Sequence, residues 1–257
     1  MHLRIVVSLL AAAALVPAAL ASCSSSTAAI AGADAGDAGT PAEAGFDPSV
    51  DPLLGCTRDP GAPVVQVDPN ATTDPAGGAA AFTLAKALDG FPAGAGKLTA
   101  GIHTESGGIK CTLDEAAAPI SVANFIGLAR GTRPYKDSTK KWKTGHFYDG
   151  LTWHRVIPGF VIQGGDPQGD GRGGPGYDLV NENHVDEPLG VLAMAAATAP
   201  SGSQFYIVVG KGPKADYNVF GACATESAVA IAALPRDADD KPSTPVHMIK
   251  VEIGRCP

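Results

Sequence analysis

The chain has 257 residues, of which 45% are hydrophobic and 18% charged, enough for one packed domain of ordinary size with additional segments. Its 32 glycines and 21 prolines favour turns over long helices. The formal net charge of −7 argues against nucleic acid as the main partner, because nucleic-acid-binding surfaces are basic.

Residues 1–22 are typical of a secretory signal peptide, because one arginine precedes an apolar run from Ile5 to Leu20. The run is too short and too rich in alanine for a membrane-spanning helix. It ends in LASC, which resembles a bacterial lipobox and implies that Cys23 becomes the lipidated first residue of an exported protein of the cell envelope. Ser24 after this cysteine favours the outer over the inner membrane. The alternative is an ordinary cleavage site with a cysteine nearby by chance.

Residues 23–63 are predicted to form a flexible tether rich in Ala, Gly, Ser and Asp, because almost no large apolar side chain is present to offset the entropy of ordering. Its DAGDAG repeat offers carboxylates, but without a loop-and-helix frame the repeat indicates a solvated linker rather than a metal site. Residues 64–96 are predicted to be an N-terminal extension with a short helix in FTLAKALDGFP, closed by Gly90 and Pro92.

Residues 97–257 are predicted to form one mainly β domain. Two β-prone runs, LTAGIHT and IKCTL, flank the hairpin signal ESGG. A helix is expected that begins at Pro119 or Ser121 and ends at Gly131, and a second helix in TESAVAIAALP ends at Pro235. Further β-prone runs lie at 151–157, 160–163, 191–195, 204–209 and 219–223 and in VHMIKVEI. Many short strands with two helices indicate a closed antiparallel barrel that is capped at its ends.

The segment WHRVIPGFVIQGGD, residues 153–166, places Arg155 and Gln163 in an otherwise apolar, strand-like run. Side chains of a strand alternate between two faces, and the break at Pro158 and Gly159 can turn the next side chain toward the polar face. One face of the sheet is therefore expected to collect Arg155, Phe160, Val161, Gln163, Gln204 and Tyr206. An apolar surface rimmed by a guanidinium and two amides is typical of a site for a small ligand or a peptide.

Four segments resemble the signature blocks of the cyclophilins, which are peptidyl-prolyl cis-trans isomerases: FYDGLTWHRVIPGFVIQGGDPQGDGRGGPGY, GVLAMA, GSQFYIVVG and NVFGAC. The resemblance runs from about Leu98 to Ile253. It implies a closed eight-stranded antiparallel β-barrel capped by two α-helices, and rotation of X-Pro bonds in proline-containing polypeptides. It also implies that no metal or cofactor is required. We expect the protein to act as a monomer.

By this resemblance Arg155 takes the place of the family's catalytic arginine. The substrate-binding positions fall on His154, Phe160, Val161, Gln163, Ala195, Ala196, Ala197, Gln204, Tyr206 and Tyr217. Strand parity predicts that His154 is a buried, hydrogen-bonded side chain rather than a proton shuttle. Ala196 replaces a family asparagine, and Gly212 and Pro213 stand where Trp or Leu would close the proline pocket. These departures motivate the alternative, a weakly active or inactive cyclophilin-fold module that binds proline-containing peptides.

Four cysteines follow Cys23, and an even number in an exported domain indicates two disulfides with three possible connectivities. Cys111 and Cys223 lie in predicted core strands, whereas Cys56 and Cys256 flank the domain. These positions favour the pairs Cys111–Cys223 and Cys56–Cys256. The alternative is a pair of buried free thiols at Cys111 and Cys223.

Other motifs carry little weight. GDGRGG, residues 169–174, fits the dinucleotide-binding pattern, but Pro175 follows it where a helix is required. The segment is therefore predicted to be a loop beside the pocket. The sequence has no G-x-S-x-G elbow for a hydrolase, and its histidines show no metal-ligand spacing, so no metal site is predicted.

Overall fold

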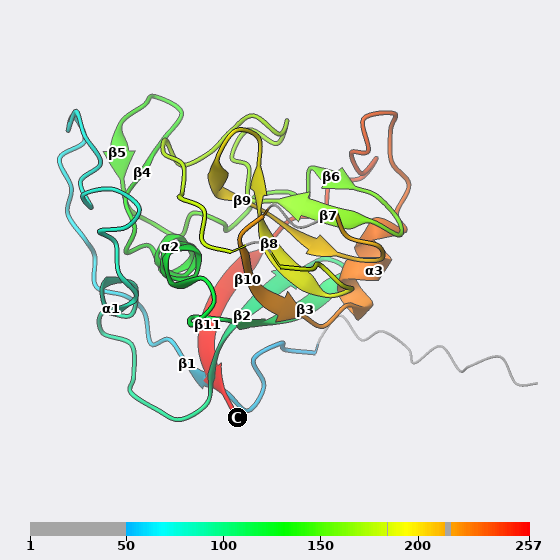
Figure 1. Cartoon of the computed structure of the whole chain (residues 1–257), viewed down its shortest axis with the longest axis horizontal. Helices are drawn as coiled ribbons and strands as arrows, with labels where there is room; N and C mark the ends of the chain where they lie inside the picture. The colour runs from blue at the N-terminus through cyan, green and yellow to red at the C-terminus, as the bar shows by residue number, and fades with distance from the viewer. Residues whose placement is uncertain (1–49, 184, 214–216) are drawn as a thin grey trace, which may run out of the picture. The chain divides into compact units, whose positions relative to one another are not determined.

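The structure is a computed structural model, and it describes residues 50–183, 185–213 and 217–257 (Figure 1). The predicted signal peptide, the lipidation position Cys23 and most of the predicted tether lie outside these residues. Among the described residues no helix is long and apolar enough to cross a membrane. The predictions for residues 1–49 therefore remain predictions. Residues 50–63, which were predicted to belong to the flexible tether, are instead held by the domain: Leu53 is fully buried, and Thr57 and Arg58 pair with Arg255 and Gly254.

One antiparallel sheet of nine strands dominates the fold, in the order β1-β11-β2-β3-β10-β8-β9-β7-β6. Its strands are β1 (Thr57–Arg58), β2 (Lys97–Thr104), β3 (Gly107–Leu113), β6 (Arg155–Val156), β7 (Val161–Gly164), β8 (Val191–Ala196), β9 (Pro200–Val208), β10 (Val219–Cys223) and β11 (Lys250–Cys256). A separate small hairpin consists of β4 (Tyr135–Lys136) and β5 (Trp142–Lys143). The prediction of a mainly β domain is confirmed.

The sheet does not close into the eight-stranded barrel that was expected. Strands β1 and β6 lie at its two edges, and no ladder joins them in the part of the chain that is described. The contact across this opening consists of one bridge, Thr152 with His247, and three backbone hydrogen bonds. The Trp153 N–H donates to the Val246 carbonyl at 3.0 Å, the Met248 N–H to the Leu151 carbonyl at 2.7 Å, and the Gly150 N–H to the Met248 carbonyl at 2.7 Å. Pro245 comes directly before this stretch and has no N–H to donate, so the ladder cannot extend there.

In the part of the chain that the structure describes, three helices accompany the sheet: α1 (Leu84–Ala87), α2 (Pro119–Arg130) and α3 (Glu226–Ala232). Proline at the first turn suits α2 because its fixed backbone angle matches a helix and its missing N–H has no partner there. Gly131 ends α2 with φ of 79°, a left-handed conformation that glycine adopts without strain. The predicted helices in the extension and in the domain are therefore all present. In Figure 1, α2 lies to the left of the sheet and α3 to its right.

The two faces of the strands bury different clusters. The main core joins α2 to one face of the sheet and includes Phe125, Leu192, Met194, Phe205, Ile207 and Phe220. Alternate positions of the same strands point to the other face and form a second cluster, the residues Val161, Val191, Ala193, Tyr206 and Val208. This alternation follows from the period of two in a strand, and it gives the second face an apolar floor away from the core.

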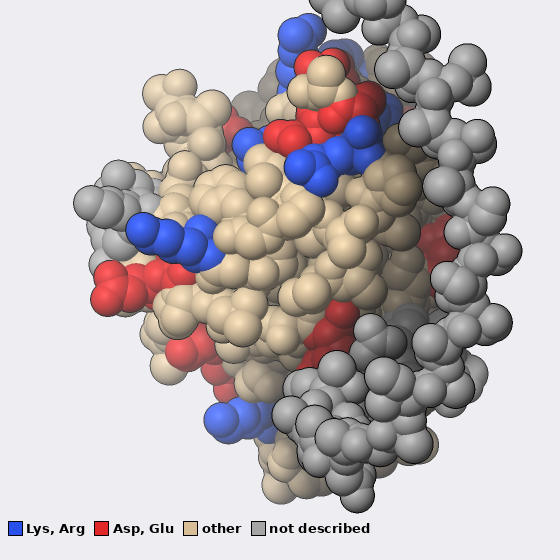
Figure 2. Space-filling view, turned by 90° about the vertical axis from the view of Figure 1, so that its right-hand side faces the viewer, with Lys and Arg blue, Asp and Glu red and all other residues tan. Residues whose placement is uncertain are grey.

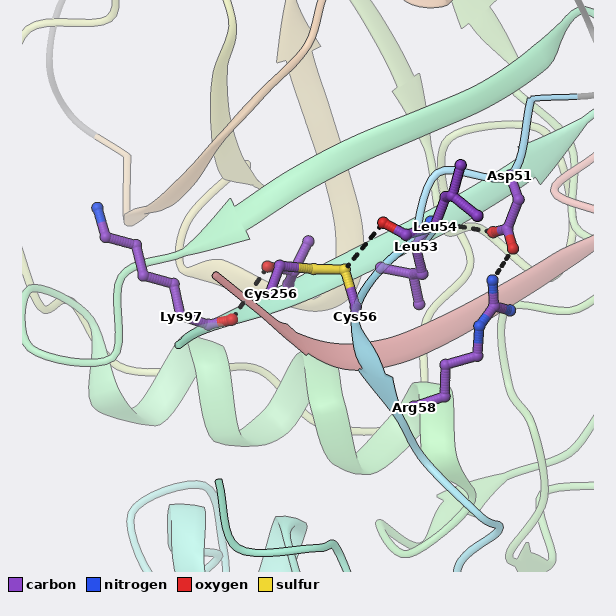
Figure 3. Close-up of a disulfide and its surroundings, with 8 residues drawn as sticks. Asp51, Leu53, Leu54, Cys56, Arg58, Lys97 and Cys256 are labelled. Atoms are coloured by element: carbon purple, nitrogen blue, oxygen red, sulfur yellow. Dashed lines mark hydrogen bonds and ion pairs between the residues drawn. A yellow bond between two sulfur atoms is a disulfide. The ribbon is translucent and has the colours of Figure 1, made fainter. Parts of the chain in front are cut away.

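Two disulfides join the pairs that the sequence positions favoured. Cys111 on β3 lies directly opposite Cys223 on β10, so that bond links neighbouring strands. Cys56 precedes β1 and is bonded to Cys256 at the end of β11, as Figure 3 shows. The alternative of two free thiols at Cys111 and Cys223 does not describe this structure.

Candidate active site

A single row of side chains crosses five neighbouring strands of the sheet. Arg155 on β6 lies opposite Gln163 on β7, and Gln163 lies opposite Tyr206 on β9. Tyr206 lies opposite Ala193 on β8, which in turn lies opposite Val219 on β10. Residues directly opposite each other have Cβ atoms about 4.5–5.5 Å apart, so the register alone brings these distant parts of the sequence together.

Arg155 stands at the open edge of this row. Its side chain is 41% exposed, and its ion-pair partner is Asp240, with 4.0 Å between Nε and Oδ2. The carboxylate of Asp240 also contacts Arg236 Nε at 3.2 Å. The Val156 N–H donates to the Asp240 carbonyl oxygen at 2.7 Å, which fixes the loop after α3 along the edge of β6. The guanidinium therefore has a loosely held carboxylate on one side and open solvent on the other.

The apolar floor next to Arg155 is the second cluster described above. Phe160, Ala195, Tyr217 and Val219 are half-buried and pack around its rim. Tyr217 meets the ring of Tyr206 edge-on, with the ring centroids 5.5 Å apart. Of the predicted substrate-binding residues, Phe160, Val161, Ala195, Tyr206 and Tyr217 therefore form one surface. Ala196 ends β8 beside it, and Ala197 follows as an exposed residue.

The two glutamines form a chain of hydrogen bonds. Gln163 Nε2 donates to Gln204 Oε1 at 2.9 Å. Gln204 Nε2 donates to the carbonyl oxygens of Gly171 and Gly173, at 3.0 and 2.8 Å. The donors of Gln204 are thus committed to the glycine-rich loop, and the predicted role of both glutamines in holding substrate falls mainly to Gln163.

A polar cavity of about 660 Å³ adjoins the guanidinium. Its lining includes His154, Arg155, Gln163, Gly171, Arg172, Asp237, Asp239 and Lys241. Figure 2 views the side of the molecule that carries β6, β7 and α3, and its surface there is largely uncharged. Charged side chains of both signs gather at the top of this face, at the level of the loop that follows α3 in Figure 1. The site thus combines an apolar floor with a charged rim.

Comparison with known proteins decides the family. The family model described as cyclophilin type peptidyl-prolyl cis-trans isomerase/CLD matches residues 99–253. The chain belongs to this cyclophilin family. Peptidyl-prolyl cis-trans isomerase A of Mycobacterium tuberculosis is 44% identical over 168 residues, which are 61% of this chain and 92% of that protein. Peptidyl-prolyl cis-trans isomerase B of Bacillus subtilis is 48% identical over 105 residues, which are 39% and 63% of the two chains.

A solved cyclophilin agrees with this assignment. The crystal structure of a cyclophilin type peptidyl-prolyl cis-trans isomerase of Cryptosporidium parvum, determined in the presence of the dipeptide Ala-Pro, superimposes with a TM-score of 0.51 and 27% identity. The match covers 60% of this chain and 98% of that one. The prediction of a cyclophilin-type isomerase is therefore confirmed.

His154 of the cyclophilin domain is buried as its strand parity predicted, with 6% of its surface exposed. The predicted hydrogen bond is wrong, because neither ring nitrogen has a partner among the described residues. The side chain lines the polar cavity. Burial lowers the pKa of His154 more than the nearby Asp166 raises it, which favours the neutral ring.

Two residues that support the site were not predicted from the sequence. Glu187 accepts a hydrogen bond from the Tyr206 hydroxyl, and Asp166 organises the glycine-rich loop. A buried tyrosine requires a partner for its hydroxyl. The two acidic residues Asp186 and Glu187 were the feature of the sequence that could have indicated such a partner. For Asp166 the signal was a run of small residues whose backbone N–H groups could all turn toward one carboxylate.

Asp166 holds the loop through its two oxygens. They accept from the N–H groups of Gln168, Asp170 and Gly171, at 2.8, 3.0 and 2.6 Å. Burial alone would raise the pKa of Asp166, but these backbone hydrogen bonds outweigh it and lower the pKa. The predicted loop beside the pocket is thus a turn built around the Asp166 carboxylate. The same loop contains Gly171 and Gly173, whose carbonyl oxygens accept hydrogen bonds from Gln204.

Replacing Asp166 with Asn should lower the free energy of unfolding at pH 7 by about 1–3 kcal/mol, because backbone donors lose a charged acceptor. The lowered pKa means that this contribution is complete above the pKa of an unfolded Asp and is lost as the pH falls through the folded value. Denaturation of both proteins between pH 7 and pH 2 measures the difference. Asp170→Asn is the control, since within residues 50–183, 185–213 and 217–257 the Asp170 carboxylate accepts only from the Arg172 N–H. A constant difference down to pH 2 would contradict the assigned role.

Proposed function

We propose that the domain catalyses the cis-trans isomerisation of X-Pro bonds in exported polypeptides, with Arg155 as the catalytic residue. The observation that carries this proposal is the row of side chains across the sheet. In that row the exposed guanidinium of Arg155 lies at the edge of the apolar floor. The activity is that of the family to which the chain belongs.

The reaction needs a donor rather than a nucleophile. The prolyl amide resists rotation by about 18–20 kcal/mol because its C–N bond has partial double-bond character. In the twisted transition state the nitrogen becomes pyramidal and regains a lone pair. A donor that points at this nitrogen binds the twisted state better than the planar state, and this difference lowers the barrier. Since no covalent bond breaks, the chemistry itself requires neither a metal nor a cofactor.

Each part of the site has a role in this mechanism. Phe160, Val161 and Tyr206 hold the prolyl ring while the other side of the amide turns. Gln163 and the main chain of residues 195–197 hold the backbone of the substrate. Arg155 suits the donor role because it is always protonated and presents a rigid fork of N–H groups.

A weakly active peptide-binding module is the second candidate. It is favoured by Gly212 and Pro213, which stand where a larger side chain was expected to close the proline pocket. Both residues are half-buried, and neither has the large side chain that would close the proline pocket. The test is the exchange rate between the cis and trans forms of a short Ala-Pro peptide, followed by NMR with and without the protein. Acceleration supports the isomerase, whereas peptide binding without acceleration supports the module.

We also propose that the domain is exported and anchored in the envelope through Cys23, with the outer membrane favoured. Two disulfides support export, because such bonds persist in oxidising compartments. A lipidated N-terminal cysteine carries more than one acyl chain, which stable anchoring requires.

Replacing Cys23 with Ser should therefore move the protein from the membrane fraction to the soluble fraction of the cell. Ser25→Ala lies two residues away and serves as the control, which should stay with the membranes. Immunoblots of separated fractions measure the distribution. A Cys23→Ser protein that still sediments with the membranes would reject the lipid anchor and leave the isomerase proposal intact.

A further inference from the structure

The floor of the apolar surface carries a polar group that the isomerase mechanism does not use. Tyr206 is only 4% exposed, yet it ends in a hydroxyl that must find a partner when buried. Its partner is Glu187, whose Oε2 accepts the hydrogen bond at 2.5 Å. Glu187 is itself only 6% exposed and lies in the segment before β8. A tyrosine and a carboxylate are therefore buried together beneath the proposed proline pocket.

The backbone around Glu187 is tightly held. The Gly190 N–H donates to the Val208 carbonyl at 2.9 Å, and the Val191 N–H donates to the Pro188 carbonyl at 3.2 Å. Gly212 packs so closely on Glu187 that a Cβ at position 212 would collide with its carbonyl oxygen. The segment that replaces the expected pocket wall thus lies directly against Glu187.

The two groups depend on each other. Burial raises the pKa of the Glu187 carboxyl more than the hydrogen bond from Tyr206 lowers it. Burial and the neighbouring Glu187 both raise the pKa of the Tyr206 hydroxyl, which therefore remains a donor. Removing either partner leaves the other buried without a hydrogen bond, which costs more than the bond itself contributes.

We propose that Glu187 is a positioning residue for proline recognition, which fixes the Tyr206 ring as the floor of the pocket through the hydroxyl. This inference rests on the proposed isomerase function. The Tyr206 ring is held at its tip by Glu187 and at its side by Tyr217. Without Glu187 the hydroxyl must turn toward water, and the ring then leaves the place where a prolyl ring would pack.

The effect should fall on KM rather than on kcat. Packing against the prolyl ring is made equally in the planar and the twisted states, and loss of such uniform binding raises KM alone. Replacing Glu187 with Leu should raise KM for a proline peptide about 10-fold and change kcat by less than about twofold. Glu187→Gln keeps an acceptor oxygen and should give an intermediate KM.

A double mutant separates this role from a general structural one. Tyr206→Phe should also raise KM, because it leaves the Glu187 carboxyl buried without its donor. Combining Glu187→Leu with Tyr206→Phe removes both polar groups together, and should return KM to within about threefold of the original value. Asp186→Leu, at the exposed neighbouring position, is the control and should leave KM unchanged.

Each outcome decides the matter. A double mutant whose increase in KM equals the product of the two single increases would overturn the proposal, and so would an unchanged KM in Glu187→Leu. If Glu187→Leu fails to fold, the KM of Glu187→Gln and the recovery in the double mutant provide the test. If the unmodified protein has no isomerase activity, the proposed function itself is rejected. If the unmodified protein is active and substitution of Glu187 leaves KM unchanged, only this inference is rejected.

Discussion

Replacing Arg155 with Ala is expected to lower kcat/KM for a proline-containing peptide by about 10²–10³-fold, the usual cost of one transition-state donor. Peptide binding should weaken much less, because the contact with the prolyl nitrogen matters most in the twisted state. Stability should change little, because the side chain is 41% exposed and its contact with Asp240 spans 4.0 Å. Such exposed ion pairs contribute little to folding. NMR exchange rates and thermal melts of the two proteins measure both effects.

Two further variants define the chemistry. Arg155→Lys should recover only part of the rate, since an ammonium lacks the planar fork of a guanidinium. Arg58→Ala is the matched control, because Arg58 is also on an edge strand and its side chain is 36% exposed. It should keep the full rate. An Arg155→Ala protein that melts normally and isomerises at the original rate would show that Arg155 is an ordinary solvated strand residue.

The face that carries the site could be predicted because it depends only on local alternation. Val161 and Gln163 on β7, and Gln204 and Tyr206 on β9, share a face wherever their strands are placed. The row that starts at Arg155 could not be predicted in the same way. It depends on which strands are neighbours and on their register, and both are set by contacts between distant parts of the chain.

The features that could not be predicted correctly from the sequence depended on contacts beyond the strand. Closure of the barrel is not confirmed, because the stretch before β11 is joined to residues 150–153 by one bridge and three backbone hydrogen bonds rather than by a ladder. His154 was expected to have a hydrogen bond because it was predicted to be buried, but its side chain lines a cavity instead. Glu187 lies in a segment without periodicity, so only the need of the Tyr206 hydroxyl for a partner could have pointed to it.

The bond between Cys56 and Cys256 should dominate the stability of the N-terminal segment. It spans 200 residues, and a bond that closes such a long loop restricts the unfolded chain strongly. Strand β1 pairs with β11 through only two residues, so few backbone hydrogen bonds hold it without the disulfide. Figure 3 shows the remaining local support, in which Arg58 contacts Asp51 beside the bond.

Replacing both Cys56 and Cys256 with Ser is therefore expected to lower the free energy of unfolding by about 2–5 kcal/mol. Activity below the melting temperature should persist, because Arg155 lies on β6, at the edge of the sheet opposite β1. Urea denaturation without reductant measures the loss, and the exchange rate of an Ala-Pro peptide measures the site. A reductant added to the unmodified protein should destabilise it at least as much, since it also opens Cys111–Cys223. Equal urea midpoints for the double variant and the unmodified protein would show that the pairing of β1 with β11 holds this segment without the bond.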